Sequence, residues 1–212
     1  MIGISGGANQ ATFRASDDYI VFPGKNYTSL QFGVFIKPVS DKIFHNGLEI
    51  NYRRKSSDLS VYTSTSNAYT NELVGRFDFD YLSFMYLPEL RFGKKYQVFI
   101  NAGPFLSLRL GTTFTGQDEY SGFFNQPSNY NQASEIARVT PAVQVGFAAT
   151  GGFNYTITEN WQISLSARYF LNLPKKDFQT QDLGVLFGVC KRLNKREKKD
   201  RKRSKLFEYL EH

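Results

Sequence analysis

Residues 96–110 read YQVFINAGPFLSLRL, and this stretch alternates between two kinds of side chain without a break. One parity is apolar from Val98 to Leu110, whereas the other carries polar residues such as Gln97, Asn101 and Arg109. A period of two predicts a β-strand with two different faces. Soluble proteins use strands of about 5 to 6 residues, whereas a tilted strand that crosses a bilayer needs about 9 to 11. The period therefore predicts a strand, and its length predicts that this strand spans a membrane.

Seven other segments alternate in the same way, and 161–173 is the clearest of them. Together with the first stretch they give eight predicted strands, at 2–13, 30–37, 43–54, 77–92, 96–110, 142–155, 161–173 and 183–190. We therefore expect an all-β protein, an eight-stranded antiparallel up-and-down transmembrane β-barrel. Proline cannot donate a ladder hydrogen bond, so Pro88 and Pro104 are each expected to mark a bulge or another strand irregularity.

The connections between the predicted strands alternate in length. Short polar turns occur at 39–42, 93–95 and 158–160, whereas long segments rich in Ser, Thr, Asn, Tyr and Gly occur at 16–27, 55–75 and 111–138. Outer-membrane barrels have short periplasmic turns and long extracellular loops, so an even strand number places both termini in the periplasm. Aromatic residues near both strand ends fit interfacial girdles. These are Trp161, Tyr96, Phe92, Tyr155 and Phe153 beside the short turns, and Tyr52, Tyr81 and Tyr169 toward the long loops.

Composition and charge exclude several other classes. The chain has no run of 18 apolar residues, which excludes a transmembrane helix. Cys190 is the single cysteine, which excludes an internal disulfide. Residues 191–205 hold ten Lys or Arg and two acids, so the positive charge of the chain is concentrated in this basic tail.

The domain organisation follows from these patterns. We expect 1–193 to form the outer-membrane barrel, 194–209 to form a basic periplasmic tail, and 210–212 to be the start of a vector-encoded histidine tag. Residues 1–7 already read as strand, so we expect that an export signal has been removed. Nucleic acid is excluded as a ligand in the periplasm. The tail then contacts anionic lipid headgroups, a cell-wall polymer or an acidic partner protein, or it is a solvated extension without a ligand.

Four runs of sequence carry a family resemblance: YLSFMYLPEL at 81–90, FINAGPFL at 99–106, GGFNY at 151–155 and LSARY at 165–169. They resemble the porin-like outer-membrane β-barrel domain family, relatives of the OmpX/OmpA-type eight-stranded barrels. The resemblance covers nearly the whole chain up to Leu193 and implies a barrel in the cell outer membrane. Members are mostly barrels of unassigned role, some attached to secretion or nutrient-uptake machinery. Such barrels usually end on an aromatic residue, whereas the last strand here runs into a basic tail.

Charged and amide side chains occupy the parity expected to face the barrel interior. An eight-stranded barrel is just wide enough inside for side chains to fill, and an unpaired charge there would be costly. We therefore predict an ion-paired, hydrogen-bonded plug, with a narrow conducting or ligand-lined lumen as the alternative. The predicted lumen network comprises Glu49, Arg53, Glu89, Gln97, Asn101, Arg109, Gln144, Arg168 and Asp182, with Arg91 and Asn154 on the same parity.

Enzymatic chemistry has little support in the chain. Outside the terminal tag the only histidine is His45, beside a predicted short turn, where a lone histidine is usually structural. Metal-ligand spacing, a nucleophile motif and a phosphate-binding glycine loop are all missing. We therefore expect a protein that is not an enzyme and has neither a cofactor nor a metal.

The long segment 111–138 is the predicted contact surface, because it holds many aromatic side chains for a loop. These are Phe114, Tyr120, Phe123, Phe124 and Tyr130. We expect an integral outer-membrane protein that contacts lipid and has a structural, adhesive or partner-binding role, exercised through a protein partner at the long loops or the basic tail. One alternative is a narrow porin for small solutes. Another is a soluble lipocalin-like ligand carrier, whose barrel would be apolar inside and polar outside.

Overall fold

A computed structural model describes residues 1–15, 20–21, 27–38, 43–64, 70–121, 140–173 and 178–192. These residues include no helix that is long and apolar enough to cross a membrane. They form a single antiparallel sheet. Its strands are β1 (Ile2–Ala15), β2 (Ile20–Val21), β3 (Thr28–Ile36), β4 (Phe44–His45), β5 (Leu48–Ser64), β6 (Thr70–Tyr86), β7 (Glu89–Gly93), β8 (Tyr96–Ser121), β9 (Val143–Thr156), β10 (Trp161–Asn172) and β11 (Phe178–Lys191).

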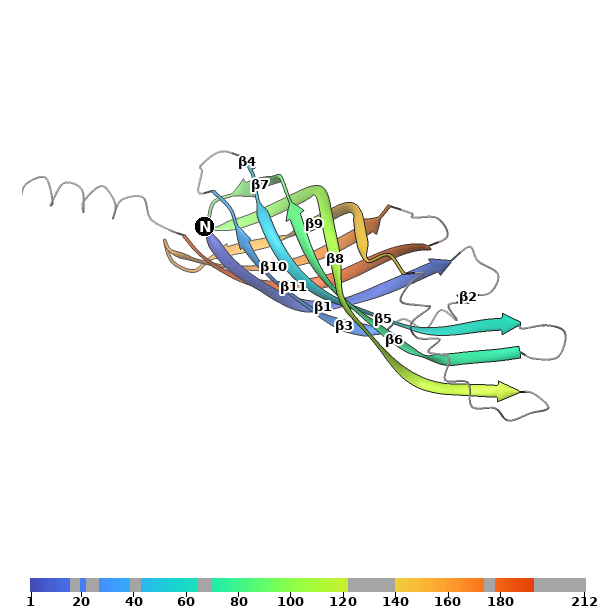
Figure 1. Cartoon of the computed structure of the whole chain (residues 1–212). Helices are drawn as coiled ribbons and strands as arrows, with labels where there is room; N and C mark the ends of the chain where they lie inside the picture. Colours follow the sequence, from blue (N-terminus) through green and yellow to red (C-terminus); the bar gives the residue numbers. More distant parts are fainter. Residues whose placement is uncertain are drawn as a thin grey trace, which may run out of the picture.

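The sheet closes on itself, because the last strand pairs with the first. The β1–β11 register runs without a break from Ile2 opposite Lys191 to Ala15 opposite Phe178. Around the wall the order is β1, β3, β5, β6, β8, β9, β10 and β11, so each strand pairs with its neighbours along the chain. The short strands β4 and β7 pair with each other and extend β5 and β6 at one end (Figure 1). The prediction of a closed, eight-stranded, up-and-down antiparallel barrel is confirmed.

The two faces of the wall have opposite character. In β3 exposed and buried residues alternate at every position, with Leu30 70% exposed and Gln31 1% exposed. The same inversion holds around the barrel, where apolar side chains point outward and Asn51, Ser83 and Ser107 are fully buried. Such an apolar exterior is unfavourable in contact with water but favourable in contact with the hydrocarbon tails of lipids. The apolar parity recognised in the sequence therefore forms the lipid-facing surface.

The two prolines lie at one interruption of the wall. Pro88 falls in the gap between β6 and β7, as the sequence predicts, and its carbonyl accepts a hydrogen bond from Ala102 N–H at 3.2 Å. Pro104 lies on β8 between Asn101, which pairs with β7, and Phe105, which pairs with β6, and β8 itself is continuous there. The register shift in the β6–β8 pairing lies elsewhere, between Asp80 and Tyr81 of β6, where the partner on β8 changes from Gly111 to Arg109.

Strands β5, β6 and β8 extend far beyond their predicted ends, and β1 and β11 are a few residues longer than predicted. β5 and β6 pair without a break up to Ser64 opposite Thr70, and β8 pairs with β6 up to Ser121. The prediction that 55–75 and 111–138 are loops is therefore wrong for 55–64, 70–75 and 111–121, and the predicted loop 16–27 contains the short strand β2 at 20–21. Ser, Thr and Tyr were interpreted as loop residues, but Thr and Tyr favour strands once a neighbouring strand pairs with them. Figure 1 shows β5, β6 and β8 running on past the ends of the other strands.

We call this projecting part the outer sheet. It consists of β2 together with 59–64 of β5, 70–75 of β6 and 111–121 of β8. β2 joins it through Ile20 opposite Val61 and Val21 opposite Ser60.

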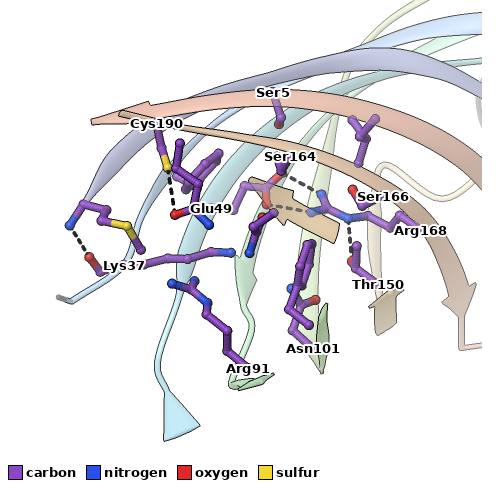
Figure 2. A pocket seen from close by; sticks show the side chains of 16 residues that line it. Ser5, Lys37, Glu49, Arg91, Asn101, Thr150, Ser164, Ser166, Arg168 and Cys190 are labelled. Carbon is purple, nitrogen blue, oxygen red and sulfur yellow. Dashed lines mark hydrogen bonds and ion pairs between the residues drawn. The ribbon is translucent and has the colours of Figure 1, made fainter. Parts of the chain in front are cut away.

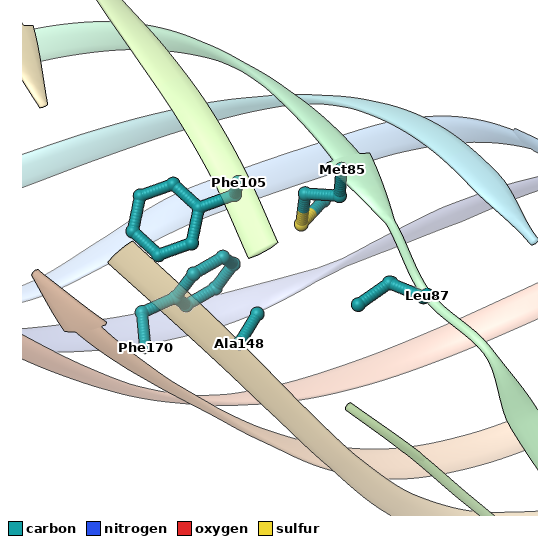
Figure 3. Close-up of a cluster of buried hydrophobic side chains, with 5 residues drawn as sticks. All are labelled: Met85, Leu87, Phe105, Ala148 and Phe170. Atoms are coloured by element: carbon teal, nitrogen blue, oxygen red, sulfur yellow. The ribbon is translucent and has the colours of Figure 1, made fainter. Parts of the chain in front are cut away.

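An apolar cluster fills part of the barrel interior. Met85, Leu87, Phe105, Ala148 and Phe170 pack together there, each buried (Figure 3). Tyr81 also points inward and is 1% exposed, so its predicted place in the outer aromatic girdle is wrong. Its parity, shared with Ser83, decides its direction, and its closeness to the long loops does not.

Candidate functional site

The interior polar residues come from alternate positions of nearly every barrel strand, because successive strand side chains point to opposite faces. The structure places Glu49, Arg53, Glu89, Gln97, Asn101, Gln144, Arg168 and Asp182 in the barrel interior as buried residues, and Arg109 as half-buried. Arg91 and Asn154 are buried as well. Their ionic groups form three separate sets along the lumen.

The middle set joins β5 to β10 across the lumen. Arg168 Nη1 and Nη2 donate to the two carboxylate oxygens of Glu49 at 2.6 and 2.8 Å, and its Nε donates to Thr150 Oγ1 at 2.9 Å (Figure 2). A two-pronged Arg–carboxylate pair is among the stronger charge-assisted contacts in proteins. All three donor nitrogens of this guanidinium thus have acceptors.

The second set lies toward the outer sheet and centres on Asp182 of β11. Arg53 Nη1 donates to Asp182 Oδ2 at 2.6 Å, and its Nη2 donates to Ser83 and Ser107 at 3.2 and 3.1 Å. Lys55 Nζ lies 3.1 Å from the same carboxylate oxygen. The two cations therefore share one carboxylate.

Lys55 is an interior residue that the sequence analysis missed. Its Nζ donates to Gln144 Oε1 at 3.0 Å and to Thr180 Oγ1 at 2.9 Å, and the side chain is fully buried. Lys55 is the first residue of the predicted loop 55–75, so it was not assigned to a strand face. Its parity, which continues that of Glu49 and Arg53, was the signal that could have identified it.

The third set lies at the end with the short turns. Glu89 Oε1 accepts from Nε of Arg91 at 2.9 Å and from Nη2 of the same residue, and Glu89 Oε2 accepts from Lys37 Nζ. Asn101 contributes a longer contact to Glu89 at 3.4 Å. Lys37 continues the inward parity of β3 but was absent from the predicted network.

The remaining predicted residues have partners outside these ion pairs. Gln97 Oε1 accepts from Gln162 at 3.1 Å, and Gln144 donates to the Tyr81 hydroxyl at 2.9 Å. Arg109 donates to the carbonyl of Thr140 at 3.0 Å and to its hydroxyl. The predicted residues thus form several local groups along the lumen and do not make one continuous cluster.

The exterior above the apolar band is ionic. Arg54 pairs with Asp80 at 2.8 Å, Tyr52 donates to the same carboxylate at 2.5 Å, and Arg76 pairs with Asp78 at 2.9 Å. These side chains occupy the lipid-facing parity of β5 and β6 near the start of the outer sheet. Charged groups are expensive in hydrocarbon, so this change marks where the apolar band ends.

The predicted contact surface on 111–138 is only partly described. Phe114 and Tyr120 belong to β8, where their backbones lie opposite Phe77 and Asn71. Phe123, Phe124 and Tyr130 lie outside the described residues, as do 194–209 and 210–212.

Within the ranges that the structure describes, no group of three or more His, Cys, Asp and Glu residues could hold a metal ion. His45 is buried in β4, opposite Glu89 of β7.

A closed β-barrel with an apolar exterior and an ion-paired interior defines an integral membrane barrel of the bacterial outer-membrane type. The model of the family described as outer membrane protein beta-barrel domain matches residues 1–175, and the chain belongs to this family. The protein is therefore located in the cell outer membrane, as predicted from the sequence, and the soluble lipocalin-like alternative is wrong.

Three solved structures align with most of the chain at low sequence identity. Ail of Yersinia pestis, in complex with the heparin analogue sucrose octasulfate, is 15% identical over 91% of this chain and 97% of its own, with a TM-score of 0.47. Neisserial surface protein A is 13% identical over 89% and 96%, with a TM-score of 0.47. OprG of Pseudomonas aeruginosa is 13% identical over 91% and 96%, with a TM-score of 0.44. No curated protein sequence matches the chain.

Proposed function

We propose that this protein is a non-enzymatic surface receptor or adhesin, whose partner binds the outer sheet in an extended conformation. The observation that carries the proposal is an edge of β8 that no described strand pairs with. β9 pairs with β8 from Tyr96 opposite Tyr155 to Leu108 opposite Val143, and the ladder ends where Arg109 N–H donates to Ala142 O. Among the described residues, no strand pairs with this edge of β8 between Leu110 and Ser121.

An unpaired strand edge is a template for another strand. Its N–H and C=O groups can pair with an extended segment of a partner, and the side chains of alternate residues then supply specificity. Eleven residues, 111–121, correspond to about 35 Å of edge at roughly 3.3 Å per residue. That length exceeds the length of a typical strand in a globular protein, so the edge is long enough to pair with a complete strand of the partner.

The membrane position of the outer sheet supports the same function. Short turns are periplasmic in outer-membrane barrels, so we place 93–95, 158–160 and the basic tail in the periplasm and the outer sheet outside the cell. The lumen contributes little to this role, because ion pairs and an apolar cluster fill it. A structural role for the interior and a binding role for the outer sheet fit this distribution better than solute transport.

Site-specific photocrosslinking in living cells tests the proposal. A photoreactive amino acid is placed at Thr113 or Thr115, both exposed on the β8 part of the outer sheet, and at Leu106 on the lipid-facing wall as the matched control. We expect a discrete protein adduct from the two outer positions and none from Leu106. The adduct should be lost when an excess of this same protein, purified, is added to the cells as a competitor. An adduct pattern that is the same at all three positions would contradict the proposal.

A further inference from the structure

Among the residues that the structure describes, the charges at the short-turn end of the lumen do not balance. Lys37 and Arg91 both donate to Glu89, so two cations share one carboxylate. Among the described residues, neither cation has a second acceptor, which leaves two Lys37 protons and Arg91 Nη1 available. Lys37 Nζ also lies 5.1 and 5.2 Å from the ring centroids of Phe35 and Phe99, which hold it in place at this end.

A cavity lies beside this imbalance. Its volume is about 30 Å³, and Lys37, Arg91, Arg168, Ser5, Asn101 and Gln162 are among its lining residues (Figure 2). Glu49 is the one carboxylate among the described lining residues, and both Nη atoms of Arg168 already bind it. A water molecule needs a cavity volume of at least about 10 to 15 Å³, so this cavity accommodates about two water molecules or an ion of similar size.

Two buried polar atoms at the cavity have no partner among the described residues. They are the hydroxyl of Ser5 and the carbonyl oxygen of the Asn101 side chain. Buried polar atoms normally have a hydrogen-bond partner from the protein or from ordered solvent. The hydroxyl can donate to an anion, and the amide oxygen can accept from a water beside it.

The other two ionic sets do not offer such a place. Arg168 and Glu49 balance one another, with all guanidinium nitrogens bonded. Lys55 and Arg53 also share a single carboxylate, and Arg53 Nε has no partner among the described residues. However, Lys55 Nζ already has the three acceptors Gln144, Thr180 and Asp182, and none of these ionic residues lines the cavity. The short-turn end thus combines an excess positive charge, unused donors and empty volume.

We infer that this cavity is a binding site for a small monovalent anion of halide size. Lys37 and Arg91 bind this anion, and its charge compensates the second of the two cations that share the Glu89 carboxylate. Desolvated charge without a counter-charge is costly in a protein interior. An anion here removes that cost and ties β3 to β7 at the end of the barrel. Larger anions such as gluconate do not fit the volume.

Crystallography with bromide is the direct test. The refolded protein is crystallised from detergent in bromide, with chloride-grown crystals as the reference, and anomalous scattering locates the ion. We expect a peak in the cavity at hydrogen-bond distance from Lys37 Nζ and an Arg91 nitrogen. Water alone in the cavity at full bromide substitution would overturn the inference.

Thermal unfolding in micelles gives a second test that needs no crystal. At constant ionic strength, replacing gluconate by chloride should raise the unfolding temperature, because an ion that binds only the folded state stabilises it. Lys37→Met leaves Glu89 with one cation and should lose this chloride-specific increase, whereas Lys94→Met, the same charge change on an exposed turn, should keep it. An equal response of wild type and Lys37→Met to chloride would also overturn the inference. If Lys37→Met does not fold, Arg91→Met takes its place.

Discussion

The guanidinium carbon of Arg53 lies 3.5 Å from the centroid of the Phe170 ring, while Nη1 of the same guanidinium donates to Asp182 at 2.6 Å. The side chain of Arg53 thus lies between an apolar cluster and a carboxylate, both inside the barrel. Arginine suits this position because its planar group stacks on an aromatic face and forms hydrogen bonds in its own plane. The contact joins the apolar and ionic parts of the lumen filling.

Arg53→Met tests the contribution of this contact to stability. We expect a loss of about 1 to 3 kcal/mol in the free energy of unfolding. Asp182 keeps Lys55 as its cation, but Asp182, Ser83 and Ser107 each lose the hydrogen bond that Arg53 donates to them. Arg54→Met is the control. Arg54 forms an exposed pair with Asp80, and such pairs contribute about 0 to 1 kcal/mol. Urea unfolding in lipid vesicles, followed by Trp161 fluorescence, measures both. Equal losses would show that burial of the pair is unimportant.

Leu106 and Ser107 should differ in their access to lipid. Leu106 is 41% exposed on the outer face, whereas Ser107 is fully buried and lies 2.7 Å from the Ser83 hydroxyl. Leu106→Arg should cost about 2 to 4 kcal/mol if the site lies near the bilayer midplane. Spin labels at the two positions should show high accessibility to a lipid-soluble quencher at 106 and low accessibility at 107. Similar values at both positions would refute the assignment of faces.

The barrel should conduct little or no current. The pairs Arg53–Asp182 and Arg168–Glu49 and the apolar cluster around Phe105 occupy the lumen of an eight-stranded barrel, which is just wide enough for side chains. Planar-bilayer recordings of the purified protein should therefore lack stable single-channel steps. Reproducible large steps would favour the narrow porin over a surface receptor or adhesin.

Shortening the outer sheet should leave the barrel intact. Replacing 59–75 by a short turn removes only pairs that lie beyond the closed wall, since the β1–β11 and β3–β5 ladders do not involve these residues. We expect the folded protein to keep its heat-modifiable gel mobility and to lose the photocrosslinked adduct of the outer sheet. A variant that fails to reach the folded gel form would show that the outer sheet is needed for assembly.

The basic tail should be dispensable for folding. Truncation after Leu193 should leave an assembled barrel, because the described strands end at Lys191. If the tail binds an anionic partner, the interaction should weaken steeply as salt rises, since exposed charges are screened. Binding of the full-length protein to anionic polymer or vesicles, compared with the truncated form, measures this. Protease that clips the tail on intact cells while sparing 111–138 would reverse the proposed orientation.

The sequence by itself determined the strands and their two faces. Alternation is a local property, because each side chain points to the face opposite that of its neighbour, so Gln97 and Val98 could be assigned without knowledge of their contacts. Proline chemistry likewise identified the interruption at Pro88. The same local reasoning failed where polar residues continue a strand, as at Lys55, because pairing with a neighbouring strand can override a loop-like composition.

Only the tertiary structure decided which interior residues meet. Glu49 and Arg168 are 119 residues apart, and Arg53 and Asp182 are 129 apart, yet both pairs form across the lumen. Their meeting depends on closure of β1 with β11 and on the stagger of every strand between them. A period of two gives the face of each residue but not its height along the barrel axis. The three ionic sets, the two cations that share Glu89 and the edge of β8 that no described strand pairs with are therefore properties of the closed barrel.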